Sequence, residues 1–166
     1  MTTTRTIPAG TSTGTGRQAF EDFSLDVPDT GTGRTVGLIG VLAETVAVTA
    51  FTDGGAAVGT YQMQGSVPAG AVLLGSKVLV PAGFAGNVSA TIIVGDGSDT
   101  DRYITGTPDV FTTAATGVQS GVPSGNKLIT TANRPTLTVT TSSDFTAAVS
   151  NGSGIVTVVI YYLQTA

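Results

Sequence analysis

The chain has 166 residues, of which 30 are threonine and 23 are glycine; only 11% are charged, and the net charge is −4. Its seven Lys and Arg residues are scattered singly, so the chain lacks the clustered cations that bind phosphates, and nucleic acid is not expected as a partner. It contains no His and no Cys, which excludes catalytic sites built on imidazole or thiol, the common zinc sites and stabilisation by disulfides.

The length and the residue types together favour one all-β domain. A chain this long can bury a substantial core, and one domain is the usual outcome at this size. Threonine and valine suit a pleated sheet, while glycine and proline supply turns between short strands. We therefore predict an antiparallel β-sandwich over residues 17–166.

The first residues, 1–16, are nearly all Thr, Ser and Gly. Such a segment has too little apolar surface to offset the entropy lost on ordering. We predict a flexible arm that is either a frayed terminus or ordered along a neighbouring subunit. It lacks a basic segment followed by an apolar run, so no secretion signal is expected.

From residue 17 onward, short apolar runs alternate with turn residues. A turn signal roughly every ten residues favours a sandwich or a barrel. The longest apolar stretch, 67–94, is broken by Pro68, Lys77 and Pro81, so no membrane partner is expected. The predicted strands are 17–26, 35–42, 45–51, 57–64, 72–80, 88–94, 102–105, 127–131, 136–141, 145–150 and 155–163.

Two kinds of strand stand out among these runs. In 136–140, Leu137 and Val139 share one face and the threonines share the other, and 45–49 alternates in the same way. The final run, 154–163, is apolar on both faces. This pattern predicts a strand that lies between two layers or packs against another subunit.

The loop 95–101 holds the densest group of acidic residues, Asp96, Asp99 and Asp101. Three carboxylates this close could converge on calcium, but the loop lacks the alternating oxygens and the closing Glu of an EF-hand. The interpretation that we favour is a hairpin whose Asp side chains accept hydrogen bonds from their own backbone. No cofactor is predicted.

Two catalytic arrangements that need neither His nor Cys are also disfavoured. A glycosidase needs two facing carboxylates, and with no Trp and only four Tyr the chain has little aromatic surface for stacking a sugar. Ser76 and Lys77 are adjacent on a predicted strand and so point to opposite faces, where they cannot share a proton. We predict that the chain is not an enzyme.

Four stretches in the second half of the chain carry a resemblance to known proteins: VPAGAVLLGSKVLVPAGF at 67–84, ATIIVGDGSDTDRY at 90–103, RPTLTVTT at 134–141 and GIVTVVIYYL at 154–163. In this order they resemble small structural proteins of tailed bacteriophages, especially capsid decoration (cement) proteins and head-fibre or tail-appendage domains. The resemblance implies a jelly-roll-like sandwich, commonly a homotrimer, bound to the outside of the capsid.

This resemblance leads to two expected functions. The first is a virion protein that binds the major capsid protein on the outer surface of the assembled capsid and stabilises the shell by bridging coat subunits. The second is a receptor-binding or fibre module that uses exposed aromatic residues such as Tyr61, Tyr103 or Phe111, although these rings could instead fill the core. For contacts with acidic coat surface the candidates are Arg5 and Arg17, but the interpretation that we favour is two solvated arginines, because exposed ion pairs contribute little.

Overall fold

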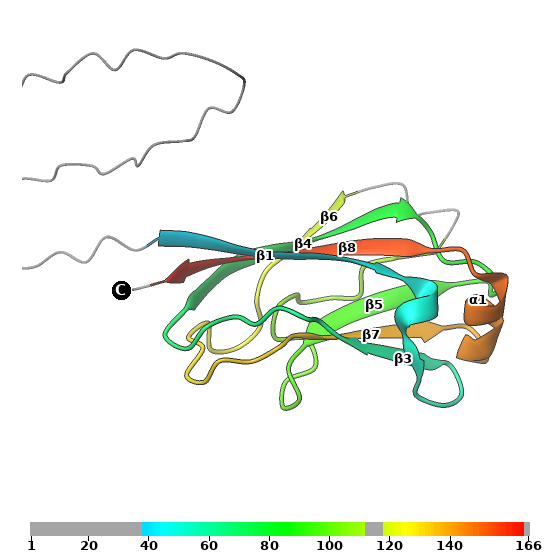
Figure 1. Cartoon of the computed structure of the whole chain (residues 1–166), viewed down its shortest axis with the longest axis horizontal. Helices are drawn as coiled ribbons and strands as arrows, with labels where there is room; N and C mark the ends of the chain where they lie inside the picture. Colours follow the sequence, from blue (N-terminus) through cyan, green and yellow to red (C-terminus); the bar gives the residue numbers. More distant parts are fainter. Residues whose placement is uncertain (1–37, 112–117, 165–166) are drawn as a thin grey trace, which may run out of the picture. The chain divides into compact units, whose positions relative to one another are not determined.

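The computed structural model describes residues 38–111 and 118–164, all within one compact unit that starts at Thr35. These residues form two antiparallel four-stranded sheets that lie one above the other (Figure 1), which confirms the predicted all-β sandwich. We name each sheet after its central strand. The β8 sheet has the order β1 (Leu38–Ala47), β8 (Ile155–Gln164), β4 (Val72–Ala82) and β6 (Val118–Gly121). The β7 sheet has the order β2 (Thr52–Asp53), β3 (Val58–Gln62), β7 (Thr136–Thr141) and β5 (Ala90–Gly95).

Consecutive strands mostly change sheet. The chain passes from β3 in one sheet to β4 in the other, returns to β5, and alternates again through β6, β7 and β8. Such alternation is the jelly-roll arrangement, in which two Greek keys fold over one core.

The core lies between the sheets. Val156, Val158 and Ile160 of β8 are fully buried on one side of it, and Leu137 and Val139 of β7 are buried on the other. Each of these sets follows the two-residue period of a strand. The inner face of each sheet is therefore specified by alternation within its own strand.

One end of the sandwich is closed by an α-helix, α1 (Phe145–Asn151), and a short 3-10 turn, Val48–Ala50. Phe145 is fully buried, and its ring lies 6.1 Å from that of Phe51, measured between centroids. In Figure 1 this end is opposite the end where β1 begins and β8 finishes. No helix of the described residues is long and apolar enough to span a bilayer.

Most predicted strands are confirmed, with shifted ends. The run 136–141 is β7, and the runs 57–64, 72–80, 88–94 and 155–163 contain or overlap β3, β4, β5 and β8. The runs 35–42 and 45–51 were wrongly separated, because β1 continues without a turn to Ala47.

Two further predicted strands, 102–105 and 127–131, are wrong: single backbone hydrogen bonds and isolated bridges, such as that between Val72 and Leu128, hold these segments. The short strands β2 and β6 were not predicted. The predicted strand 17–26 and the predicted arm 1–16 lie outside the described residues.

The run 145–150 was wrongly predicted as a strand and is α1. The side chain of Asp144 accepts a hydrogen bond from the backbone N–H of Thr146 at 2.9 Å, which caps the helix N-terminus. Gly152, with φ of 69°, ends the helix in the left-handed conformation. Phe145, Ala148 and Val149 recur at helical spacing and turn toward the core.

Candidate functional site

The outer face of the β8 sheet is apolar at the end where β1 begins and β8 finishes. The register places Ile39 of β1 beside Leu163 of β8, and Leu163 beside Val72 of β4. An isolated bridge then joins Val72 to Leu128. Apolar side chains therefore form a continuous row across the sheet.

A second apolar row follows directly. Val41 pairs with Tyr161, and Tyr161 pairs with β4 next to a register shift at Leu74. Ile39 is 70% exposed, Val41 54% and Leu74 50%, which is high for large apolar side chains. We call the surface formed by both rows the apolar face, and it consists of Ile39, Val41, Val72, Leu74, Leu128, Tyr161 and Leu163.

Strand β8 explains why this surface exists. Val156, Val158 and Ile160 are buried in the core, whereas Val159 and Tyr161 point outward and are partly exposed. The sequence left open whether β8 lies between two layers or against another subunit. Among the described residues, the β7 sheet covers its inner face, and no strand or helix covers its outer face.

Charge is almost absent from the outer face of this sheet. Among the outward-facing strand residues whose side chains the structure describes, Lys77 is the one charged residue. Its Nζ lies 5.7 Å from the ring centroid of Tyr161, at the outer range of a cation–π contact. Farther from the apolar face the surface becomes hydroxylated, and the Thr45 and Thr157 hydroxyl oxygens are 2.8 Å apart.

The outer face of the β7 sheet has different chemistry. Thr138 pairs with Thr60 of β3, and Thr140 pairs with Thr91 of β5. These threonines lie opposite the buried Leu137 and Val139, which confirms the alternation predicted for 136–140. This face offers hydroxyl groups to solvent.

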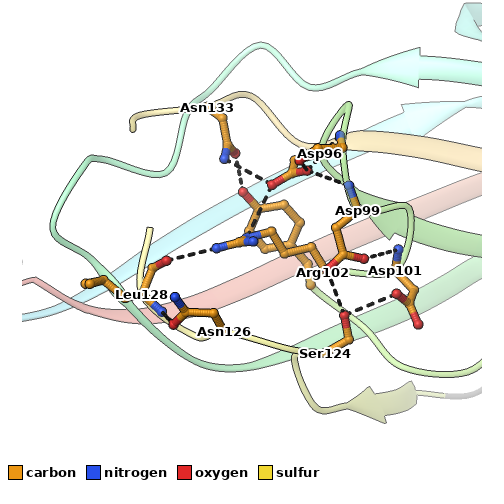
Figure 2. Close-up of polar contacts among 10 residues, drawn as sticks. Asp96, Asp99, Asp101, Arg102, Ser124, Asn126, Leu128 and Asn133 are labelled. Atoms are coloured by element: carbon orange, nitrogen blue, oxygen red, sulfur yellow. Dashed lines mark hydrogen bonds and ion pairs between the residues drawn. The ribbon is translucent and has the colours of Figure 1, made fainter. Parts of the chain in front are cut away.

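The acidic loop 95–101 mainly hydrogen-bonds to itself (Figure 2). Asp96 Oδ1 accepts hydrogen bonds from the backbone N–H groups of Ser98 at 3.0 Å and Asp99 at 2.9 Å, and Asp99 Oδ1 accepts one from Asp101 N–H at 3.4 Å. This confirms the self-capping hairpin. Within the part of the chain that the structure describes, no group of three or more acidic residues is placed to hold a metal ion.

Asp96 also anchors this loop to Arg102 and Asn133. Arg102 Nε lies 3.2 Å from Asp96 Oδ2, an ion pair without the alignment of a hydrogen bond, and Arg102 Nη2 donates to the Leu128 carbonyl at 2.9 Å. Asn133 Nδ2 faces Asp96 Oδ2 at 3.5 Å. Burial alone would raise the pKa of Asp96, but hydrogen bonds from Asp99 and Ser98 and the charge of Arg102 hold this pKa below its usual value.

We call Asp96, Arg102, Asn133 and Tyr103 the polar clamp. The Tyr103 hydroxyl donates a hydrogen bond to Asn133 Oδ1. Burial, with the charge of Asp96, raises the pKa of Tyr103 to about 12. The clamp borders an open cleft of about 390 Å³. Asp96, Asn133 and Tyr103 bond to one another and to the nearby backbone, so the geometry is that of a structural clamp that fixes two loops.

The aromatic residues that were candidates for ligand recognition contribute to the core. Tyr103 is fully buried, and Tyr61 and Phe111 are partly buried against the core. The Tyr61 hydroxyl donates to Glu44 Oε1 at 2.6 Å. The core interpretation is therefore confirmed for Tyr103, while Tyr61 and Phe111 pack partly against the core.

The two cations singled out from the sequence, Arg5 and Arg17, lie outside the described residues and are not placed. Ser76 and Lys77 do lie on opposite faces of β4: Ser76 is buried and donates to the Tyr103 carbonyl at 2.6 Å, while Lys77 is exposed. The apolar face itself was not predicted. Its signal in the sequence was limited to the two-sided apolar pattern of β8.

No family model matches this chain, and no curated protein matches it. Among solved structures, it is similar to a chain in the capsid asymmetric unit of cyanophage Pam1, with 24% identity over 93% of this chain and 97% of that chain, and a TM-score of 0.46. It is also similar to a chain in the acidic stable capsid structure of the Helicobacter pylori bacteriophage KHP30, with 16% identity over 75% of this chain and 95% of that chain, and a TM-score of 0.42. At these TM-scores the two likenesses carry no argument about function.

Proposed function

We propose that this chain is a structural protein of a tailed-phage virion. It binds the outer surface of the assembled capsid through the apolar face and stabilises the shell by bridging coat subunits. The observation that carries the proposal is the pair of apolar rows on the β8 sheet that no described strand or helix covers, with Ile39 70% exposed. The proposal rests on the sequence pattern and the surface of this chain.

A surface of this chemistry fits a protein partner. Contiguous exposed apolar patches on folded domains mark interaction sites, and the buried centre of an interface is poor in charge. The apolar face meets both conditions. Its two rows are contiguous across the sheet, and its seven residues are all uncharged, with Lys77 lying beside them and not among them. The partner surface is expected to be apolar and weakly charged as well.

Binding of this kind would stabilise a capsid by thermodynamic linkage. A ligand that binds the assembled shell but not its dissociated subunits stabilises the shell by its binding free energy, summed over all bound copies. If bound copies are joined to one another, as a dimer or as the homotrimer that the resemblance implies, every contact after the first becomes intramolecular and raises the avidity. The major capsid protein is the proposed partner.

The three aromatic residues named for the receptor-binding alternative give it little support. Recognition by stacking needs exposed rings, whereas Tyr103 is buried and Tyr61 and Phe111 pack against the core. No observation in the described residues favours this function over capsid binding.

The test is co-sedimentation of the purified chain with mature heads that lack it. Val41→Asp places a carboxylate on the apolar face and is expected to weaken head binding at least about tenfold, because burying an unpaired charge costs more than about 1.4 kcal/mol. The matched control, Thr138→Asp, places the same charge on the outer face of the β7 sheet. It should bind like the wild type.

A second readout is the temperature at which the heads are disrupted. Wild-type protein and the Thr138→Asp control should raise it, and Val41→Asp should not. Wild-type protein that neither sediments with heads nor raises their disruption temperature would refute the proposed function.

A further inference from the structure

Three of the four sheet edges in the described sandwich are protected. Strands β2 and β6 are short, with two and four residues. The edge of β5 is covered by the segment 103–111, through hydrogen bonds that include Tyr103 N–H to the Val94 carbonyl at 3.0 Å and Val110 N–H to the Ala90 carbonyl at 2.9 Å. Short or covered edges are the usual means by which proteins prevent strands of other chains from pairing with them.

The fourth edge, formed by β1, is long and regular. All ten residues of β1 pair with β8 without a register shift. Val48 N–H donates to the Gly154 carbonyl at 2.9 Å, in the same register as this ladder. The even-numbered residues of β1 are therefore the ones whose backbone groups bond to β8. Because hydrogen-bonding direction alternates along an antiparallel strand, the odd-numbered residues of β1 turn their N–H and C=O groups away from β8.

These outward backbone groups have no hydrogen-bond partner among the described residues. They belong to Ile39, Val41, Ala43, Thr45 and Ala47. Among the described residues, the strand therefore presents an evenly spaced set of donors and acceptors without partners along its length.

The β1 edge carries little of the chemical protection that exposed edges usually have. The strand contains no Pro, Lys or Arg. Its one charged residue, Glu44, turns inward, where its carboxylate accepts hydrogen bonds from the Tyr61 hydroxyl at 2.6 Å and from Gln64 N–H at 2.8 Å. Lysines, prolines and bulges are common devices against edge pairing, and β1 shows none of them. An inward-pointing charge is another such device, but the Glu44 carboxylate is already hydrogen-bonded within its own sandwich.

We propose that the edge of β1 pairs antiparallel with β1 of a second copy of this chain. The pairing joins two β8 sheets into one continuous sheet about a two-fold axis near Ala43. This inference goes beyond the proposed function and does not depend on it, since it concerns the purified chain alone.

The side chains of β1 are self-complementary in this arrangement. A two-fold axis at Ala43 sets Thr45 opposite Val41 and Ala47 opposite Ile39, so that each larger apolar side chain faces a smaller one. Glu44 then faces Leu42 and not the Glu44 of the second copy. The register therefore avoids a direct pair of like charges, which is destabilising in a sheet.

The protected edges argue for a second β1 as the occupant. A head-to-tail contact between copies would need β1 to pair with a different edge, but within residues 38–111 and 118–164 the other three are short or covered. Pairing of β1 with itself is the edge contact that two copies can make. It is isologous and closes after two subunits.

Charge pairing at the axis provides the test. In both Ala43→Lys and Ala43→Glu, like charges face each other across the two-fold axis, so each variant alone should show half the wild-type mass by sedimentation equilibrium. An equimolar mixture of the two should recover the wild-type mass, because Lys then faces Glu. The control, Ser120→Lys, adds a charge to the opposite edge strand of the same sheet and should keep the wild-type mass.

Ala43→Pro gives an independent test. It removes an N–H that points to the open edge and leaves the β1–β8 hydrogen bonds in place, which a proline on an edge strand permits. It should also halve the mass, with a wild-type circular dichroism spectrum as evidence of folding. A wild-type mass equal to that of Ala43→Lys would overturn the proposal, since the edge would then be free or filled by a coat strand or another segment. Variants that all keep the wild-type mass would overturn it too.

Discussion

The outer faces of the two sheets occupy equivalent positions in the sandwich but differ in chemistry. On the β7 sheet, threonines such as Thr138 and Thr140 alternate with buried Leu137 and Val139. On the β8 sheet, Val159 and Tyr161 stand outward between buried Val158 and Ile160. A sheet with one face in solvent normally shows the first pattern. The second pattern is the observation on which the proposed binding surface rests.

The largest expected effect separates the inner and outer faces of β8. Val158 is fully buried, so Val158→Asp places a carboxylate in the core and should cost about 4 kcal/mol or more, enough to unfold many domains. Val159→Asp puts the same group on the uncovered face, where the cost should be about 1 kcal/mol. Urea unfolding of both variants is the measurement. Equal losses would mean that the outer face of β8 is covered in the free protein.

A change of intermediate size is expected in the pH dependence of the free energy of unfolding, which should involve the polar clamp and not the apolar face. The pKa of Asp96 is lowered in the folded state, so its carboxylate stabilises the fold above the unfolded-state pKa, near 4. That stabilisation is lost as the pH falls through the lowered folded-state pKa. Asp96→Asn should cost about 1–3 kcal/mol at neutral pH, because Arg102 loses its partner, and should flatten the acid dependence of stability.

The measurement is the free energy of unfolding of both proteins in urea between neutral pH and the acid range. The apolar variant Val41→Thr, which changes no charge, should keep the wild-type pH dependence. If Asp96→Asn shows the same acid slope as the wild type, Asp96 does not contribute to acid stability as described.

The smallest effect would extend the apolar face toward its hydroxylated end. The double change Thr45→Val and Thr157→Val removes an exposed hydroxyl pair and keeps two β-branched side chains. Stability should change by no more than about 0.5 kcal/mol, because exposed hydroxyl contacts contribute little. Head binding should be retained or increased in co-sedimentation. A loss of binding would mean that the contact uses these hydroxyl groups and not the apolar rows.

Local patterns in the sequence predicted the sandwich and several of its strands. The strand at 136–141 was located to the residue, because Leu137, Val139 and the intervening threonines alternate without interruption. The predictions of secondary structure failed where the local sequence pattern differs from what capping or strand pairing in the folded chain imposes. At 145–150 the apolar residues suit either structure over one or two turns, and the capping by Asp144 decided for the helix. β6 consists of Val, Gln, Ser and Gly and is a strand because β4 pairs with it.

The apolar face depends on contacts that no local pattern contains. Its first row brings Ile39, Leu163 and Val72 together from three distant parts of the chain. The sequence of β8 showed that both of its faces are apolar. Which residues lie beside each face, however, depends on strand order and register. The open edge of β1 was equally beyond prediction, because it depends on which strand lies last in the sheet.

The most direct test of the central claim is covalent footprinting of side chains in the free and the capsid-bound protein. If the outer face of the β8 sheet is the binding surface, labelling of Ile39, Val41 and Leu74 should fall sharply when the protein binds heads. Labelling of Thr138 and Thr140 should not change. Protection of the threonines with continued labelling of the apolar face would contradict the account.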